Sequence, residues 1–174
     1  MPTDEQAKQY VAGIFDRASE TYDQTGVDYF GSLGRLVASA AELRPGERVL
    51  DVGSGRGAVL LPAAQAVGPS GSVDGVDLAP GMVTRLSADL DRLGRDNATV
   101  VLGDAQDPPV QGPYDVVVSG MVLFFLPDPT VAVRRYRELL RAEIGRTVAD
   151  PAGVDQEIGE LFAALACRER GDLM

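Results

Sequence analysis

Residues 49–57 have the sequence Val49-Leu50-Asp51-Val52-Gly53-Ser54-Gly55-Arg56-Gly57. A short apolar run that contains an acid leads directly into a loop of alternating glycines, and residues 58–64 after it are rich in alanine and leucine. Glycine is favoured where the backbone turns through positive φ or where a ligand approaches the main chain. A helix start presents unpaired N–H groups. We therefore predict a buried strand, a glycine loop and a helix, which is the kind of junction at which open α/β folds bind ligands.

The loop is compatible with two classes of ligand. Gly53, Gly55 and Ala58 fit the dinucleotide fingerprint G-x-G-x-x-G/A, and Asp77 follows about 20 residues beyond the loop. Asp51 counts against a dinucleotide, because a carboxylate at the mouth of the loop repels a pyrophosphate. The same carboxylate suits a ligand with a cationic end, such as an ammonium or a sulfonium. A glycine-rich turn without a ligand is the third interpretation.

The composition limits the class of protein. With 174 residues, of which 45% are hydrophobic and 24% charged, the chain is suited to one globular domain. A net charge of −10 would repel a phosphate backbone, so we expect no nucleic-acid partner. No apolar run is long enough to span a membrane and residues 1–5 do not resemble a signal peptide, so we expect a cytoplasmic protein without a membrane partner.

Two residue types are rare or absent in a way that restricts the chemistry. The chain has no histidine, which excludes serine–histidine hydrolase chemistry and any histidine base. Cys167 is the single cysteine, which excludes an internal disulfide and a zinc cluster, and we expect no metal.

Helical and strand patterns alternate along the chain. The spacing of apolar residues predicts helices over about 4–22, before 45, over 58–67, 80–93 and 129–141, and after 150. Strands are predicted at 49–52, 72–77, 99–102, 114–119 and 145–149. This alternation predicts an α/β fold with a Rossmann-like, doubly wound, mostly parallel sheet.

Four motifs follow one another in the order of one enzyme family. They are the 49–57 stretch, Val76-Asp77-Leu78-Ala79-Pro80-Gly81-Met82, Gly103-Asp104-Ala105, and the segment 114–129 with Asp115, Ser119, Gly120, Phe124 and Phe125. Together they resemble the class I S-adenosylmethionine (SAM)-dependent methyltransferases, over roughly residues 11–149. The similarity is greatest to the small-molecule enzymes of the ubiquinone/menaquinone-biosynthesis type and their natural-product relatives.

The resemblance implies SAM as the cofactor and suggests a role for each motif. Asp51 would attract the methionine ammonium, and the loop at Gly53 and Gly55 would approach the methionine and ribose. Asp77 would accept both ribose hydroxyls. The further implied cofactor contacts are Ser54 in the loop, Leu78 and Met82 on the adenine faces, Asp104 and Ala105 at the adenine edge, and Ser119 and Gly120 beneath the sulfonium.

Methyl transfer from a sulfonium is an in-line displacement, so the enzyme chiefly positions the acceptor and excludes water. If a base is needed, the candidates are Tyr22, Asp23, Asp28 and Tyr29, and the sequence selects none of them. Tyr22, Tyr29 and Phe30 are the aromatic residues of the N-terminal segment expected closest to a ligand. Phe124 and Phe125 either form an apolar wall for the acceptor or pack in the core.

The expected function is methyl transfer to the O, N or C atom of a small organic acceptor of quinone or natural-product type. One alternative is a catalytically weak SAM-binding module that needs a partner chain. A nicotinamide-dependent oxidoreductase is the less favoured alternative, because of Asp51 and the lack of a recognisable catalytic set.

The C-terminal part departs from the family pattern. We expect one domain over 1–174, with a helical cover (1–45), a cofactor-binding core (46–149) and a terminal helix (150–174). From the sequence we expect an altered turn at 142–145, and we expect 150–174 to leave no room for the antiparallel strand pair usual in the family. The strand at 146–149 would then be an exposed edge, so we expect self-association through it.

Overall fold

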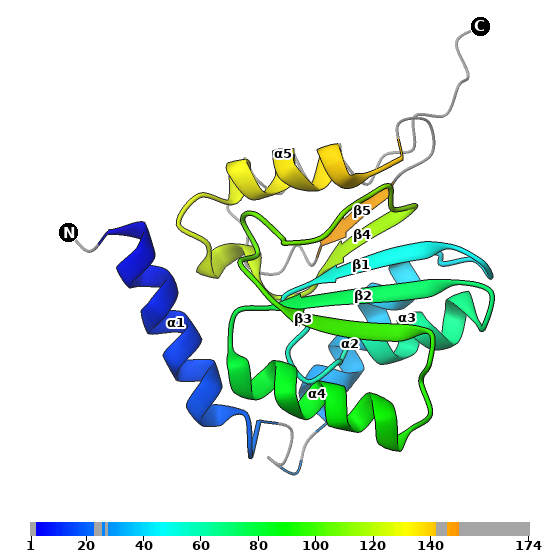
Figure 1. Ribbon diagram of the computed structural model, residues 1–174, viewed down its shortest axis with the longest axis horizontal. Coiled ribbons are helices and arrows are strands. Elements are labelled where there is room, and N and C mark those ends of the chain that lie inside the picture. The colour runs from blue at the N-terminus through cyan, green and yellow to red at the C-terminus, as the bar shows by residue number, and fades with distance from the viewer. Residues whose placement is uncertain (1–2, 23–25, 27, 142–145, 150–174) are drawn as a thin grey trace, which may run out of the picture.

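The computed structural model of the chain is organised around one parallel β-sheet (Figure 1). It describes residues 3–22, 26, 28–141 and 146–149. The strands are β1 (Arg48–Val52), β2 (Ser72–Asp77), β3 (Ala98–Leu102), β4 (Val116–Ser119) and β5 (Arg146–Ala149). Their order is β3-β2-β1-β4-β5, and every neighbouring pair is parallel. The predicted parallel sheet is confirmed.

Helices cover both faces of this sheet (Figure 1). The helices α2 (Tyr29–Ala40), α3 (Leu60–Val67) and α4 (Pro80–Arg92) pack on one face. The helix α5 (Pro129–Leu139) and the 3-10 helix η1 (Leu123–Phe125) pack on the other. Successive side chains of a strand point to opposite faces, so in β1 Val49 joins the cluster with α3 whereas Leu50 and Val52 join the cluster with α5. Asp51 therefore points to the α3 face.

The position of β1 in the sheet explains where a ligand can bind. β1 lies between β2 and β4, so the strand order reverses there, and such a point forms a crevice at the carboxyl ends of the strands. The glycine loop begins at this edge. The Gly53 and Ser54 N–H groups both donate to the Val76 carbonyl oxygen, at 2.7 and 3.0 Å, which fixes the loop to the end of β2.

The first helix, α1 (Asp4–Ala18), differs from the others because none of its residues is buried. Thr3 caps it through a reciprocal pair of hydrogen bonds with Gln6, a capping box that satisfies two otherwise free N–H groups. It stands beside the carboxyl ends of the strands, with its C-terminal end near the start of α4 (Figure 1). Helix α1 therefore lies at the edge of the sheet where the strands end, and not in the core.

Several boundaries differ from the sequence patterns. Helix α1 ends at Ala18 and not at 22, and α5 ends at Leu139. Helix α3 begins at Leu60 because residues 55–59 are still turning out of the glycine loop. β4 begins at Val116, since Tyr114 forms only an isolated bridge to Leu140.

Some expectations lie outside the described residues. These are Asp23, the altered turn at 142–145, the helix after 150 and the lack of an antiparallel strand pair. β5 is the outermost strand of the described sheet on its side, and self-association through it stays a prediction. Within the residues that the structure describes, no helix is both long and apolar enough to cross a membrane.

Candidate functional site

A pocket of about 470 Å³ opens at the carboxyl edge of the sheet. Its volume is within the range usual for small-molecule sites. Its walls come from α1, the start of α2, the glycine loop and the segments that follow β2, β3 and β4. Of the predicted cofactor residues, those that line it are Gly53, Ser54, Gly55, Asp77, Leu78, Met82, Asp104, Ala105 and Gly120. The structure therefore brings four separate sequence motifs to one cavity.

Asp51 lies buried at the end of β1, with 1% of its surface exposed, and is not part of the pocket lining. Neither carboxylate oxygen has a hydrogen-bond partner among the described residues. Burial, and after it the nearby negative charge of Asp77, raise the pKa of Asp51 to about 7. The Leu60 N–H at the start of α3 does not reach hydrogen-bond geometry but acts in the opposite direction. A buried acid without a partner is costly, so this position favours a cationic ligand group.

Gly53 cannot be replaced by a larger residue without displacing a neighbour. Its φ is +73°, and a Cβ atom there would lie 2.1 Å from Cγ2 of Val122. Gly55 also has a positive φ, +51°, but no atom lies within 4 Å of the place that a Cβ atom would take. The first glycine is therefore required by packing and by its backbone conformation, and the second by its backbone conformation alone.

Asp77 ends β2 and holds the glycine loop in place. Its Oδ2 accepts from the Gly55 N–H at 2.7 Å and its Oδ1 accepts from the Ala79 N–H at 2.9 Å. Burial raises the pKa of Asp77, and the backbone N–H groups of Ala79, Gly55 and Leu78 act in the opposite direction. An ionised carboxylate offers about four acceptor positions. Two of them are left for hydroxyl groups of a ligand.

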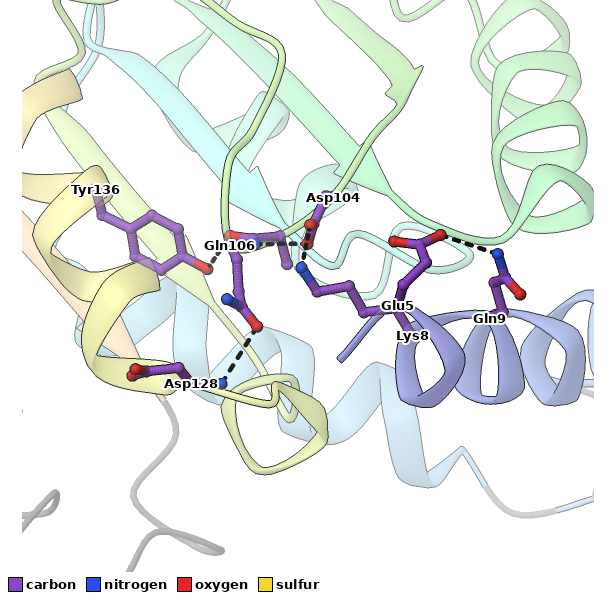
Figure 2. A network of polar contacts seen from close by, with 8 residues as sticks. Glu5, Lys8, Gln9, Asp104, Gln106, Asp128 and Tyr136 are labelled. Atoms are coloured by element: carbon purple, nitrogen blue, oxygen red, sulfur yellow. Dashed lines mark hydrogen bonds and ion pairs between the residues drawn. The ribbon is translucent and has the colours of Figure 1, made fainter. Parts of the chain in front are cut away.

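Asp104, after β3, belongs to a polar network that connects three parts of the chain (Figure 2). Its Oδ1 accepts from the Gln106 N–H at 2.8 Å, and its Oδ2 accepts from Lys8 Nζ of α1 at 2.6 Å. The Gln106 side chain accepts from the Asp128 N–H at 3.2 Å, before α5. Tyr136 of α5 donates to the carbonyl oxygen of Ala105 at 2.8 Å. This network fixes the carboxylate of Asp104 and the backbone of Ala105 at one end of the pocket.

The segment after β4 forms another side of the pocket. Ser119 is buried and its hydroxyl donates to the Val52 carbonyl oxygen at 3.3 Å, so it ties β4 to β1 and does not line the pocket. Gly120 and Met121 do line it. Met121 has a φ of +58°, a conformation that a residue with a side chain adopts only at some energetic expense. Strain of this kind is concentrated at functional sites.

Aromatic rings form part of the pocket lining. The rings of Tyr22 and Phe30 stack with centroids 4.3 Å apart, and Phe15 of α1 contacts both Tyr22 and Phe125 edge to face, at 5.9 and 5.2 Å. Phe15, Tyr22, Phe30 and Phe125 all line the pocket, whereas Phe124 is 51% exposed and does not. The four lining rings offer a wall for a planar or apolar acceptor.

The candidate bases are placed very differently. Tyr22 lines the pocket, and burial together with the charge of Asp77 raises its pKa to about 12. Asp28 also lines the pocket and forms an exposed ion pair with Arg35 at 2.7 Å. Tyr29 is 58% exposed and lies outside the lining.

Two cations near the site were not singled out from the sequence. Lys8, the chain's one lysine, pairs with Asp104. Arg56 in the glycine loop donates to the Ser19 carbonyl oxygen at 3.0 Å and to Asp89 at 2.7 Å, which connects the loop to the end of α1 and to α4. In the sequence, Lys8 is distinguished only as the single lysine among many arginines. Arg56 is distinguished only by its position in the glycine loop.

Comparisons with known proteins agree with this geometry. A family model described as a methyltransferase domain matches residues 49–143. The chain is 40% identical over 139 residues to aklanonic acid methyltransferase DauC of Streptomyces sp. strain C5, covering 79% of this chain and 63% of that protein. It is 43% identical over 131 residues to nocamycin O-methyltransferase of Saccharothrix syringae, covering 75% and 47%. The chain thus spans about half to two thirds of the length of these relatives.

A solved structure shares the fold. It is described as a SAM-dependent methyltransferase from Aquifex aeolicus, with a TM-score of 0.66, 21% identity, and coverage of 78% of this chain and 79% of that one.

Proposed function

This chain belongs to the methyltransferase domain family, and from that premise we propose that it binds SAM in the pocket and directs methyl transfer to a small organic acceptor. One observation carries the proposal: the buried, unpartnered carboxylate of Asp51 lies at the end of β1, where the glycine loop begins. Burial without a hydrogen-bond partner makes the ionised form of that acid costly, and the ammonium at the methionine end of SAM would stabilise it. A dinucleotide would instead bring a pyrophosphate toward Asp51 and Asp77.

The pocket residues fit the cofactor's methionine and ribose portions. Asp51 attracts the ammonium, and Gly53 lets the ligand approach the main chain. Asp77 accepts the ribose hydroxyls with the two acceptor positions left by Gly55 and Ala79. Gly120 lines the floor beneath the sulfur, and Ser119 supports it through the bond to Val52.

The adenine end is bounded by residues after β2 and β3. Leu78 and the almost fully buried Met82 form an apolar surface for the ring faces. Asp104 accepts from the adenine amino group, and the Ala105 N–H donates to a ring nitrogen. The network through Gln106 and Tyr136 keeps both groups in place.

When bound, SAM supplies a methyl group already activated by its positive sulfur. What the chain contributes is orientation and exclusion of water. Tyr22 remains protonated up to high pH, since its pKa is raised to about 12, so it shapes the site and does not act as a base near neutral pH. Asp28, which pairs with Arg35, is the other described candidate base that lines the pocket.

The proposed acceptor is a small, largely apolar or aromatic molecule. The four aromatic rings that line the pocket support this. Both relatives are named as methyltransferases of small molecules, and the name nocamycin O-methyltransferase supports an oxygen atom as the methylated group. No comparison supports the nicotinamide-dependent alternative.

Calorimetric titration with SAM, S-adenosylhomocysteine and NAD in parallel tests the proposal. Binding of both sulfur compounds without binding of NAD is the expected result. Binding of NAD alone, or of none of the three, would contradict it. Tight binding of SAM without methyl transfer to any of a panel of aromatic acids and phenols would instead favour a binding module that works with a partner chain.

A further inference from the structure

The polar contacts of α1 with the rest of the molecule are concentrated toward its C-terminal end. Asp16 accepts from the Gly81 N–H at 2.6 Å, at the start of α4. Just after the helix, Glu20 pairs with Arg85 at 2.6 Å, and the Ser19 carbonyl accepts from Arg56. This end is therefore attached to both α4 and the glycine loop.

The N-terminal half of α1 is attached differently. Among the described residues 3–15, Lys8 alone makes a hydrogen bond or ion pair with another element, and its partner is Asp104 after β3, 2.6 Å away. Figure 2 shows the Lys8 side chain reaching from the helix to that carboxylate. The C-terminal end of α1 is thus attached to the start of α4, which follows β2, and its N-terminal half to the segment after β3.

One face of α1 covers the pocket between these attachments. Lys8, Val11, Ala12 and Phe15 all line it, and their spacing puts them on one side of a helix. No residue of α1 is buried in the core. Besides the edge-to-face contact of Phe15 with Phe125 at 5.2 Å, the Lys8–Asp104 pair is therefore what attaches this part of α1 over the pocket.

The Lys8–Asp104 ion pair can persist when a ligand is bound in the pocket. The side chains of Lys8 and Asp104 are only 18% and 30% exposed, so the attraction is screened less than in a surface ion pair. Asp104 has accepted two hydrogen bonds, from Lys8 and Gln106, and can accept more. A neutral amino group can therefore donate to Asp104 beside Lys8, but it cannot replace the positive charge.

We propose that Lys8 is a positioning residue for the cofactor: its ion pair with Asp104 holds α1 closed over the adenosine end of the ligand and slows its release. The inference rests on the proposed function, because it requires that the pocket bind SAM or S-adenosylhomocysteine. Lys8 acts through Asp104 and through α1, and takes no part in the chemistry.

The test measures the dissociation rate of S-adenosylhomocysteine from the full chain and from Lys8→Met, Lys8→Arg, Asp104→Asn and the double variant Lys8→Met/Asp104→Asn. Lys8→Met is expected to speed dissociation about fivefold, the upper range for one exposed or partly exposed pair. Lys8→Arg should restore most of the slow rate. Lys8→Met should have little further effect in the Asp104→Asn background. Arg17→Met, which removes an equal charge from an exposed position on α1, is the matched control and should leave the rate unchanged.

A second measurement separates closure from general stability. Backbone amides of residues 4–18 should gain protection from hydrogen exchange when S-adenosylhomocysteine binds to the wild type, and should gain little in Lys8→Met. The thermal midpoint of the ligand-free protein should be nearly the same in both, since Lys8 is outside both core clusters.

Three outcomes would overturn the inference. Dissociation from Lys8→Met within twofold of the wild type would show that the pair does not hold the ligand. Slower dissociation or tighter binding would show that Lys8 competes with adenine. An undiminished effect in the Asp104→Asn background would show that Lys8 works through another group. If the wild type does not bind S-adenosylhomocysteine, the proposed function fails together with the role of Lys8; if it binds and Lys8→Met releases it equally fast, the role of Lys8 alone fails.

Discussion

Replacing Asp51 with asparagine should have opposite effects on folding stability and on cofactor binding. Asp51 is fully buried without a hydrogen-bond partner among the described residues, and its pKa is raised from 3.8 to about 7. Between these two pKa values the folded chain binds a proton that the unfolded chain has lost, so stability falls as the pH rises from about 4 to about 7. Above pH 7 the whole penalty is present.

The size of the penalty follows from the shift. A pKa difference of one corresponds to 1.36 kcal/mol, so the rise of the Asp51 pKa from 3.8 to about 7 corresponds to at most about 4 kcal/mol. Asp51→Asn removes the charge at nearly constant volume. The free energy of unfolding of the ligand-free protein at pH 8 should therefore rise by about 1–4 kcal/mol, whereas at pH 4 the variant and the wild type should be nearly equal. Urea unfolding at the two pH values measures this.

Cofactor binding should change in the opposite direction to folding stability when Asp51 is replaced. An ammonium near Asp51 favours its ionised form, so S-adenosylhomocysteine should bind the wild type more tightly as the pH rises from 5.5 to 7.5, with release of a proton. Asp51→Asn should bind it more weakly at pH 7.5 and lose most of this pH dependence. Adenosine, which has no ammonium, should bind both proteins equally. Equal losses for adenosine and S-adenosylhomocysteine, or a variant less stable than the wild type at pH 8, would refute the electrostatic reasoning.

Three further substitutions test other parts of the site. Asp77→Ala should weaken binding of S-adenosylhomocysteine by about 1.5–3 kcal/mol, measured by calorimetry, because it removes a charged acceptor; a change below threefold would make the ribose assignment wrong. Gly53→Ala should abolish detectable binding in the same assay, because its Cβ would lie 2.1 Å from Val122 Cγ2 and displace the pocket wall. Gly34→Ala should lower the free energy of unfolding by about 1–3 kcal/mol, because its Cβ would lie 2.1 Å from the carbonyl oxygen of Ala58 where α2 approaches the glycine loop.

Matched controls exist for the two glycine substitutions. Gly55→Ala also places a side chain at positive φ, but no atom lies within 4 Å of the new Cβ, so it should weaken binding less than Gly53→Ala. Ser39→Ala changes an exposed position of α2 and should leave stability almost unaffected. If either control matched its partner, the steric explanation for that glycine would fail.

The sequence predicted those parts of the site that depend on local patterns. An apolar strand followed by glycines fixes where the backbone of residues 53–57 must turn, and an acid at the end of the next strand, Asp77, must lie at the same edge of a parallel sheet. Neither inference needs the helices to be packed correctly. The parallel sheet and the pocket at its carboxyl edge follow from the same alternation of elements, whereas the strand order β3-β2-β1-β4-β5 does not.

The remaining contacts depend on packing between distant segments. Lys8 and Asp104 are separated by 96 positions, and no local pattern connects them. The sequence made Tyr22 and Tyr29 equally good candidates for a position at the ligand. In the structure Tyr22 stacks on Phe30 in the pocket lining, whereas Tyr29, the first residue of α2, is exposed and lies outside the lining. Their different positions are set by how α2 packs on the glycine loop, which the periodicity of apolar residues does not determine.

The charges around the pocket account for the kind of ligand that fits. The charged residues that line the described pocket are Lys8, Asp28, Arg35, Arg56, Asp77, Arg95 and Asp104. Three of the cations pair with acids: Lys8 with Asp104, Arg35 with Asp28 and Arg56 with Asp89. Asp51 is buried nearby without a hydrogen-bond partner among the described residues. Burial raises the pKa of both Asp51 and Asp77, and the charge of Asp77 raises the pKa of Asp51 further. A ligand with a positive methionine end relieves the repulsion between these two acids, whereas a pyrophosphate increases it. The glycine spacing of the loop fits a dinucleotide, but the carboxylate of Asp51 makes the site favour a cationic ligand. The Asp51→Asn variant should therefore reduce the preference for SAM over NAD.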